Sequence, residues 1–348
     1  MKDISELKSL AFRLTSRCNL NCMFCGQSKQ AITSKGSEKS TNSQRSHLSL
    51  DQLKYIVNQL VVYRPQIYLW GGEPLIYPYL SDFVRYLRAN KLSVFITTNG
   101  VLLNRFYKLF TAIKISYLTI SLEVFKACHE KLRGVPNIYD QILSNLLTLH
   151  RYKLSQNKIL PLININVLIT GYNYQEINKF CDYLLDLKFV HSIRLQLPMF
   201  FSTGAMDKFS TYVKDTFSSS CTESWRYFTD DYQSIDIKKL KRKLDMALSH
   251  KQIRLFPEIS TNEVHHWFQK PNLAFRSCCT TSFRRINVEP NGDLIACTDF
   301  PETVYGNALQ KPIHDLLNNS IICKHRQSIA MKLKEVCPRC SHLYLYND

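Results

Sequence analysis

The chain of 348 residues contains neither a long apolar stretch nor a secretory signal. No run of about 18 apolar residues occurs, which argues against a membrane-spanning helix. The start, Met1 to Glu6, is polar and has no signal-peptide core. Disulfides belong to oxidising compartments, so we expect the twelve cysteines to be thiols or metal ligands in a cytoplasmic protein.

Acidic residues are scarce. The 45 Lys and Arg exceed the 28 Asp and Glu, giving a net charge of +17. Such a charge attracts an acidic peptide, RNA or a phosphorylated small molecule. The basic residues are scattered and no RNA-binding module occurs, so we do not expect a nucleic-acid partner. A solvated basic surface without a partner is the alternative.

Three cysteines within eight residues are the most informative feature. Cys18, Cys22 and Cys25 have the spacing C-x3-C-x2-C and follow a strand-like segment, 10–14. Three thiolates can hold three irons of a four-iron cluster and leave the fourth iron open to a small molecule. Structural zinc is the alternative, but zinc takes four ligands, usually as two separated pairs, and no fourth ligand lies nearby in sequence.

Apolar runs alternate with helical patterns along the first 200 residues. This alternation predicts βαβ units around a parallel sheet, that is, an α/β fold with a partial (β/α)6, TIM-like barrel. Residues 28–47 are polar, and we expect a mobile loop or an insertion there. The expected strands are 10–14, 67–70, 93–97, 117–122, 162–169 and 192–197, and the expected helices are 49–62, 79–90, 103–112, 138–152 and 174–188.

Two further motifs follow expected strands. Gly71-Gly72-Glu73-Pro74 follows one strand, and Thr98-Asn99-Gly100 ends the next. The carboxyl ends of barrel strands carry the chemistry, so one mouth should gather both motifs and the cysteine loop.

A second cysteine group lies near the carboxyl end. Asn291-Gly292 between apolar runs predicts a hairpin that brings Cys279 and Cys297 together. Cys337 and Cys340 add a C-x2-C pair, which completes a closed four-cysteine site. Cys278 is the alternative to Cys279, and zinc is an alternative occupant.

The order of these segments resembles that of radical S-adenosylmethionine (SAM) enzymes, and the second cysteine group resembles their SPASM/twitch extension. The resemblance implies SAM, a [4Fe-4S] cluster on Cys18, Cys22 and Cys25, and one auxiliary [4Fe-4S] cluster. It implies a barrel core over 1–200 and a cluster domain over 275–348. The bridging segment 201–274 matches nothing in the family.

The resemblance also suggests residues that contact SAM. By analogy, Phe24 packs near adenine, and Gly71 to Pro74 with Glu73 receive the amino group. Asn99 reaches SAM or simply forms its turn. Ser121 and Arg133 contact the ribose and carboxylate. The family's Ser-x-Asp-Gly is replaced here by Ser-Leu-Glu-Val, with Glu123 in the place of Asp.

The activity implied is reductive cleavage of SAM to a 5′-deoxyadenosyl radical, which takes a hydrogen atom from the substrate. The first hypothesis is a maturase for the oxidative modification (crosslinking, thioether formation or epimerisation) of a ribosomally made peptide. The alternative is a dehydrogenase or epimerase of a small molecule such as an amino sugar or cyclitol. RNA modification and a non-catalytic metal module are remote alternatives. We expect an electron donor of the flavodoxin or ferredoxin type. A separate leader-peptide-binding protein is expected because the barrel begins near residue 9.

Overall fold

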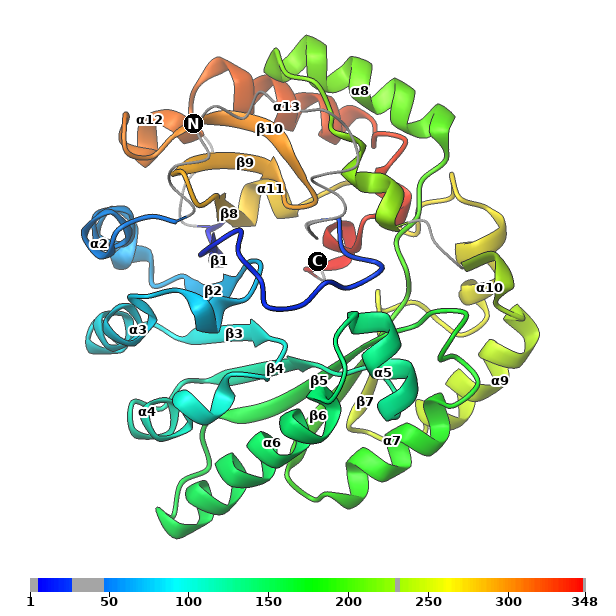
Figure 1. Ribbon diagram of the computed structural model, residues 1–348. Coiled ribbons are helices and arrows are strands. Elements are labelled where there is room, and N and C mark those ends of the chain that lie inside the picture. Colours follow the sequence, from blue (N-terminus) through cyan, green and yellow to red (C-terminus); the bar gives the residue numbers. More distant parts are fainter. Residues whose placement is uncertain (1–5, 27–46, 229–231, 347–348) are drawn as a thin grey trace.

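One curved mixed sheet runs through the molecule (Figure 1). The computed structural model describes residues 6–26, 47–228 and 232–346. Ten strands lie in the order β10-β9-β8-β1-β2-β3-β4-β5-β6-β7. They are β1 Ser9–Arg13, β2 Gln66–Trp70, β3 Val94–Thr98, β4 Tyr117–Ser121, β5 Leu162–Leu168, β6 Val190–Gln196, β7 Ile253–Phe256, β8 Arg285–Val288, β9 Asp293–Cys297 and β10 Phe300–Asn307.

Helices cover the outside of the curved sheet (Figure 1). Because the parallel strands need crossover connections, a helix separates most of them along the chain. The helices are α2 Leu50–Asn58, α3 Leu80–Ala89, α4 Tyr107–Ala112, α5 Lys126–Arg133, α6 Ile138–Ser155, α7 Ile177–Asp186, α8 Thr203–Phe217, α9 Ile237–Ala247, α10 Glu263–Gln269, α11 Thr281–Arg284, α12 Ile313–Leu317 and α13 Ser320–Met331.

The predicted α/β class with a parallel sheet and a carboxyl-terminal extension is confirmed, and the sheet is longer than predicted. The bridging segment contributes β7, which pairs parallel with β6. The extension contributes β8, which pairs parallel with β1 on the other side. All pairings from β8 to β7 are parallel, and only β9 and β10 are antiparallel. The three predicted domains therefore share one sheet, and their boundaries stay a prediction.

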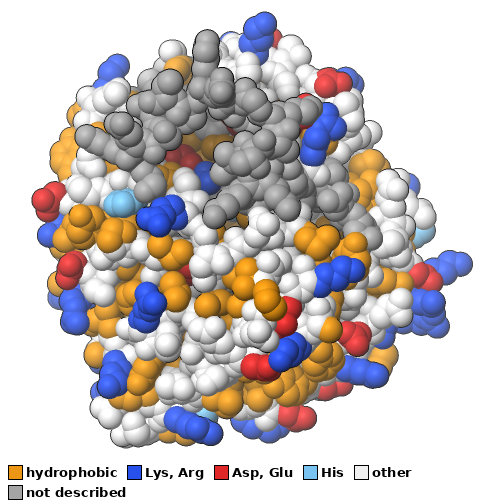
Figure 2. All heavy atoms as spheres, in the orientation of Figure 1, with side chains coloured by type: hydrophobic (Ala, Val, Ile, Leu, Met, Phe, Trp, Pro, Cys, Tyr) orange, Lys and Arg blue, Asp and Glu red, His pale blue; other side chains and the backbone are white. Residues whose placement is uncertain are grey.

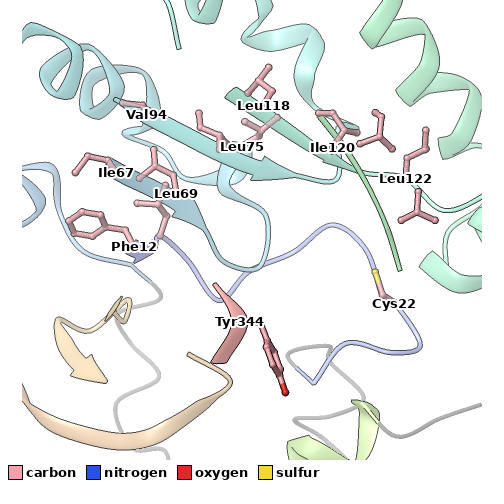
Figure 3. Packing of buried hydrophobic residues seen from close by; sticks show 14 of the residues in the cluster. Phe12, Cys22, Ile67, Leu69, Leu75, Val94, Leu118, Ile120, Leu122 and Tyr344 are labelled. Atoms are coloured by element: carbon pink, nitrogen blue, oxygen red, sulfur yellow. The ribbon is translucent and has the colours of Figure 1, made fainter. Parts of the chain in front are cut away.

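Apolar side chains between the strands and the outer helices form the core. Successive strands contribute Phe12, Leu69, Ile96 and Leu118, each at most 1% exposed. Figure 3 shows members of this cluster along neighbouring strands, with Cys22 on the cysteine loop and Tyr344 in the short 3₁₀ helix Ser341–Tyr344. Burial of this face fixes which strand residues point into the barrel, because side chains alternate along a strand.

Local sequence signals explain where two helices begin. Ser49 and Gln52 form a capping box at the start of α2, with both reciprocal hydrogen bonds present. The helical residues that follow β10 are divided into α12 and α13. The side chain of Asn319 accepts a hydrogen bond from the Ile322 amide, which starts a new helix there. Of the predicted loop over 28–47, all but His47 lies outside the described residues.

The surface matches the scattered charge of the sequence. Figure 2 shows Lys and Arg side chains spread over the visible face without one dominant patch. Within the described ranges, every helix is too short or too polar to cross a bilayer.

Gly306 tests the packing of the extension. A Cβ there would lie 2.3 Å from Leu316 Cδ2, at a backbone φ of +154°. Because Leu316 is buried, we expect Gly306→Ala to reduce the free energy of unfolding by about 1–3 kcal/mol. The measurement is the thermal midpoint of the anaerobic holoprotein. Gly204→Ala, in open space within α8, is the control and should be neutral or slightly stabilising. Equal thermal midpoints for Gly306→Ala and Gly204→Ala would contradict the close packing of Gly306 against Leu316.

Candidate active site

A cavity of about 330 Å³ lies at the carboxyl ends of the barrel strands. The predicted gathering of three motifs at one mouth is confirmed, because the cysteine loop, the GGEP segment and the turn after β3 all line this cavity. From these segments and their neighbours its wall includes Cys18, Cys22, Phe24, Cys25, Gly71, Gly72, Glu73, Thr98, Asn99, Ser121, Glu123 and Arg133.

The GGEP segment holds the beginning of the cysteine loop through its backbone. The amide of Gly72 donates to Thr15 O at 2.8 Å, and the amide of Glu73 donates to Arg17 O at 2.8 Å. A Cβ on Gly72 would lie 2.1 Å from Arg17 O. The absence of a side chain at these glycines lets the cysteine loop approach the GGEP segment closely.

The three thiols of this loop line the cavity, with Cys22 buried and with Cys18 and Cys25 half-buried. Burial raises the pKa of Cys18 to about 11, and the neighbouring Cys22, Glu73 and Cys25 raise it further, against a hydrogen bond from the Leu20 amide. A metal that binds there must displace the thiol protons.

No group of three or more His, Cys, Asp or Glu side chains in the described part of the chain lies close enough for a single metal ion. A four-iron cluster is wider than one ion, so its thiolates stand further apart than the ligands of a single metal.

Glu73 is the buried anion of the cavity. Its carboxylate is 1% exposed and accepts hydrogen bonds from the Leu75 amide at 2.9 Å, the Thr98 hydroxyl at 2.6 Å and the Asn99 amide at 2.8 Å. Burial raises its pKa, against these three hydrogen bonds. A cationic ligand in the cavity would offset the cost of this burial.

Arg133 faces the cysteine loop instead of open space. Its guanidinium donates to Cys22 Sγ at 3.6 Å and to Glu123 Oε1 at 2.5 Å, and Cζ lies 5.2 Å from the centre of the Phe24 ring. Glu123 is fully buried and also accepts from the Leu168 amide at 3.0 Å. Glu123, which stands in the place of the family's Asp, therefore positions Arg133.

The other predicted SAM contacts have defined places. Asn99 Oδ1 accepts from the Val101 amide at 3.0 Å, which is the turn expected of Asn before Gly, and its Nδ2 donates to Asn19 Oδ1 at 2.9 Å. Ser121 ends β4 and lines the cavity. Pro74 is buried at the start of a short 3₁₀ helix. Their contacts with SAM stay predictions.

Sequence interpretation missed the inner wall of the barrel. Tyr68, Trp70, Thr97, Asn166 and Gln196 line the same cavity. Tyr68 bonds to Thr97 through their hydroxyls at 2.8 Å, and Asn166 donates to Gln196 at 3.1 Å. The signal was present in Leu162–Leu168, where polar Asn alternates with buried Ile and Val. In a barrel, such alternation indicates a polar lumen.

The four predicted auxiliary ligands lie together beside the hairpin. Burial raises the pKa of Cys297 and Cys340 well above its usual value, and the other cysteines of the group raise it further. Burial likewise raises the pKa of Cys337 to about 12, with Cys279 adding to the effect. Cys278 is exposed. In contrast, Cys279 contributes to the raised pKa of Cys297, Cys337 and Cys340. This geometry favours Cys279 over Cys278, and the ligand set stays a prediction.

Asp299 connects the two cysteine groups. It lines the cavity, while its Oδ2 lies 4.0 Å from Cys340 Sγ and 3.8 Å from His342 Nε2. A ligand in the cavity is therefore separated from the second cysteine group by little more than this side chain.

The bridging segment holds the C-x2-C pair. Arg339, between the two cysteines, is 2% exposed and donates to the backbone oxygens of His266 and Lys270, at the end of α10, and of Leu273. Its guanidinium carbon lies 4.7 Å from the centre of a Trp267 ring. Segment 201–274, which had no predicted role, thus forms the support of the auxiliary site.

The side chains present at the two cysteine groups fit the cofactors that the family resemblance implies. Three thiols and a buried carboxylate at one cavity wall suit an open cluster with a bound amino acid. Four half-buried thiols around one hairpin end and the C-x2-C pair suit a fully ligated cluster.

Gly72 tests the support of the cysteine loop. Because any Cβ would collide with the Arg17 carbonyl, we expect Gly72→Ala to displace the loop and lower the iron bound by reconstituted protein from about eight to about four per chain. Iron and sulfide analysis checks this, with Gly204→Ala as the control. Full iron in Gly72→Ala would show that the close approach is dispensable.

Comparison with known proteins agrees with this geometry. The Radical SAM superfamily model matches residues 12–184, and the iron-sulfur cluster-binding domain model, SPASM, matches residues 278–341. An AdoMet-dependent heme synthase of Methanosarcina barkeri (strain Fusaro / DSM 804) is 27% identical over 173 residues, which are 49% of this chain and 45% of the relative. The chain spans about half the length of the curated relatives it matches.

Two solved structures share the fold at low sequence identity. Streptococcus suis SuiB bound to the precursor peptide SuiA has a TM-score of 0.64 at 15% identity, covering 97% of this chain and 70% of SuiB. Native anSMEcpe with bound AdoMet has a TM-score of 0.62 at 15% identity, covering 96% of this chain and 88% of anSMEcpe. The matches confirm an enzyme whose cofactors are SAM and [4Fe-4S] clusters, including an auxiliary one. The chain belongs to the radical SAM superfamily, in the subgroup that carries the SPASM/twitch extension.

Proposed function

We propose that this enzyme oxidatively modifies a ribosomally made peptide. When bound, the open cluster and SAM supply a 5′-deoxyadenosyl radical that removes a hydrogen atom from a substrate C–H bond. Glu73 and Arg133 orient SAM against the cysteine loop, and the polar wall from Tyr68 to Gln196 orients the substrate. The half-buried position of this wall limits the access of water to the radical.

The observation that carries the proposal is the position of Asp299 between the cavity and the second cysteine group. A substrate in the cavity lies next to both sites. Hydrogen-atom transfer to the 5′-deoxyadenosyl radical would give 5′-deoxyadenosine and leave a substrate radical. Cys279, Cys297, Cys337 and Cys340 would hold an auxiliary cluster that could accept one electron from this radical, and one proton would leave to solvent as the new bond closes. The net result is a two-electron oxidation.

The cavity wall favours oxidation over epimerisation. An epimerase needs a hydrogen donor, often a free thiol, beside the substrate radical. Among the described residues, the only cysteines that line the cavity are Cys18, Cys22 and Cys25, the ligands proposed for the SAM cluster. Crosslink or thioether formation therefore fits this site better than epimerisation.

A peptide fits the charge and the fold. The excess of 45 basic over 28 acidic residues suits an acidic partner, and SuiB, solved with a precursor peptide, has the same fold. An external electron donor of the flavodoxin or ferredoxin type would start each cycle, and a separate protein would bind a leader peptide. The second candidate is oxidation of a small molecule, favoured by the relative named for heme synthesis.

Co-expression with short peptides encoded beside its gene tests the proposal. The modified peptide should lose two hydrogen atoms per event in its intact mass. Cys337→Ala/Cys340→Ala should still form 5′-deoxyadenosine but no product, because the electron acceptor is lost. Cys18→Ala/Cys22→Ala/Cys25→Ala should form neither, and Cys323→Ala is the control. Unchanged peptide masses, together with deuterium transfer from a labelled small molecule to 5′-deoxyadenosine, would establish the second candidate instead.

A further inference from the structure

The auxiliary site has charges of opposite sign on two sides. Asp299 lies on the side of the cavity, where its Oδ2 is 4.0 Å from Cys340 Sγ. Lys334 lies on the other side, toward α8 and α13. The backbone carbonyl of Lys334 accepts a hydrogen bond from the Cys337 amide at 2.9 Å, which places this residue directly beside the C-x2-C pair.

Two contacts hold the Lys334 ammonium. Its Nζ donates to Ser328 Oγ at 2.6 Å and lies 4.5 Å from the centre of the Tyr212 ring. Tyr212 is in turn fixed by a hydrogen bond of 2.8 Å between its hydroxyl and Nδ1 of His325, which is 2% exposed. Ser328 and His325 belong to α13 and Tyr212 to α8. The ammonium is thus held by two helices that pack together.

Lys334 brings a positive charge to the turn that leads into Cys337, and Glu335, the next residue, brings a negative one. A nearby positive charge stabilises the more negative state of a cluster, and cluster potentials follow local charge and hydrogen bonding.

We propose that Lys334 is a positioning residue that raises the reduction potential of the auxiliary cluster, so that this cluster takes the electron from the substrate radical. The inference rests on the proposed function, in which the auxiliary cluster is the electron acceptor. Tyr212, His325 and Ser328 keep the ammonium in place. The bridging segment, through α8, then helps to set the potential as well as to support the site.

Redox titration of the anaerobic holoenzyme, followed by electron paramagnetic resonance, tests this role. Lys334→Gln should lower the midpoint potential of the auxiliary cluster by an amount equal to about a tenfold change in its reduction equilibrium, 59 mV for one electron. The potential of the SAM cluster should not move. Lys334→Arg, which keeps the charge, should retain most of the wild-type potential.

Two neighbouring variants are matched controls. Lys332→Gln removes an exposed charge two residues away and should leave the potential unchanged, whereas Glu335→Gln should raise it. If Lys334→Gln loses iron, Ser328→Ala, which frees the ammonium, should shift the potential in the same direction by less. Equal shifts in Lys332→Gln and Lys334→Gln, or none in either, would overturn this inference alone. A wild-type protein with only one cluster would overturn the proposed function as well.

Discussion

The buried carboxylate of Glu73 is the interaction on which the rest of the site depends. Its hydrogen bonds from Thr98 and Asn99 join the GGEP segment to the end of β3 and the turn that follows, and its backbone amide joins the same segment to the cysteine loop at Arg17. Parallel strands bring these loops to one edge of the sheet, and this network fixes them relative to one another. The anion left at the centre gives the cavity its preference for a cationic ligand.

The segments that carry and support the second cysteine group belong to the same sheet as the barrel. The extension adds β8 beside β1, and the bridging segment adds β7 beside β6, so both ends of the barrel sheet contribute to the auxiliary site. Arg339 then fixes the C-x2-C pair on α10. As a result, Asp299 belongs both to the cavity wall and to the surroundings of Cys340, and a substrate placed for hydrogen abstraction lies within reach of an electron acceptor.

The sequence predicts those parts of the site that depend on fixed spacing. The cysteine runs, GGEP and the hairpin at Gly292 need particular residues at particular distances, so they are visible without a structure. Contacts between residues far apart in the sequence cannot be predicted in this way. The glycine of GGEP approaches Arg17, and Glu123 binds Arg133, because of packing between segments that no local pattern records. The alternation of polar and apolar residues in Leu162–Leu168 was visible in the sequence, but it indicates a polar lumen only once the strand is known to belong to a barrel. The role of Arg339 could not be predicted, because its partners lie in segment 201–274, whose fold the sequence did not reveal.

The central claim is that one cluster is open to SAM and the other is closed. Electron paramagnetic resonance of the reduced holoenzyme, recorded with and without SAM, tests it most directly. The account predicts two [4Fe-4S] signals, of which only the one from Cys18, Cys22 and Cys25 changes when SAM binds. A change in both signals would mean that the auxiliary site is also open, and a single signal would mean that the four carboxyl-terminal cysteines do not hold a cluster. Either result would contradict the account.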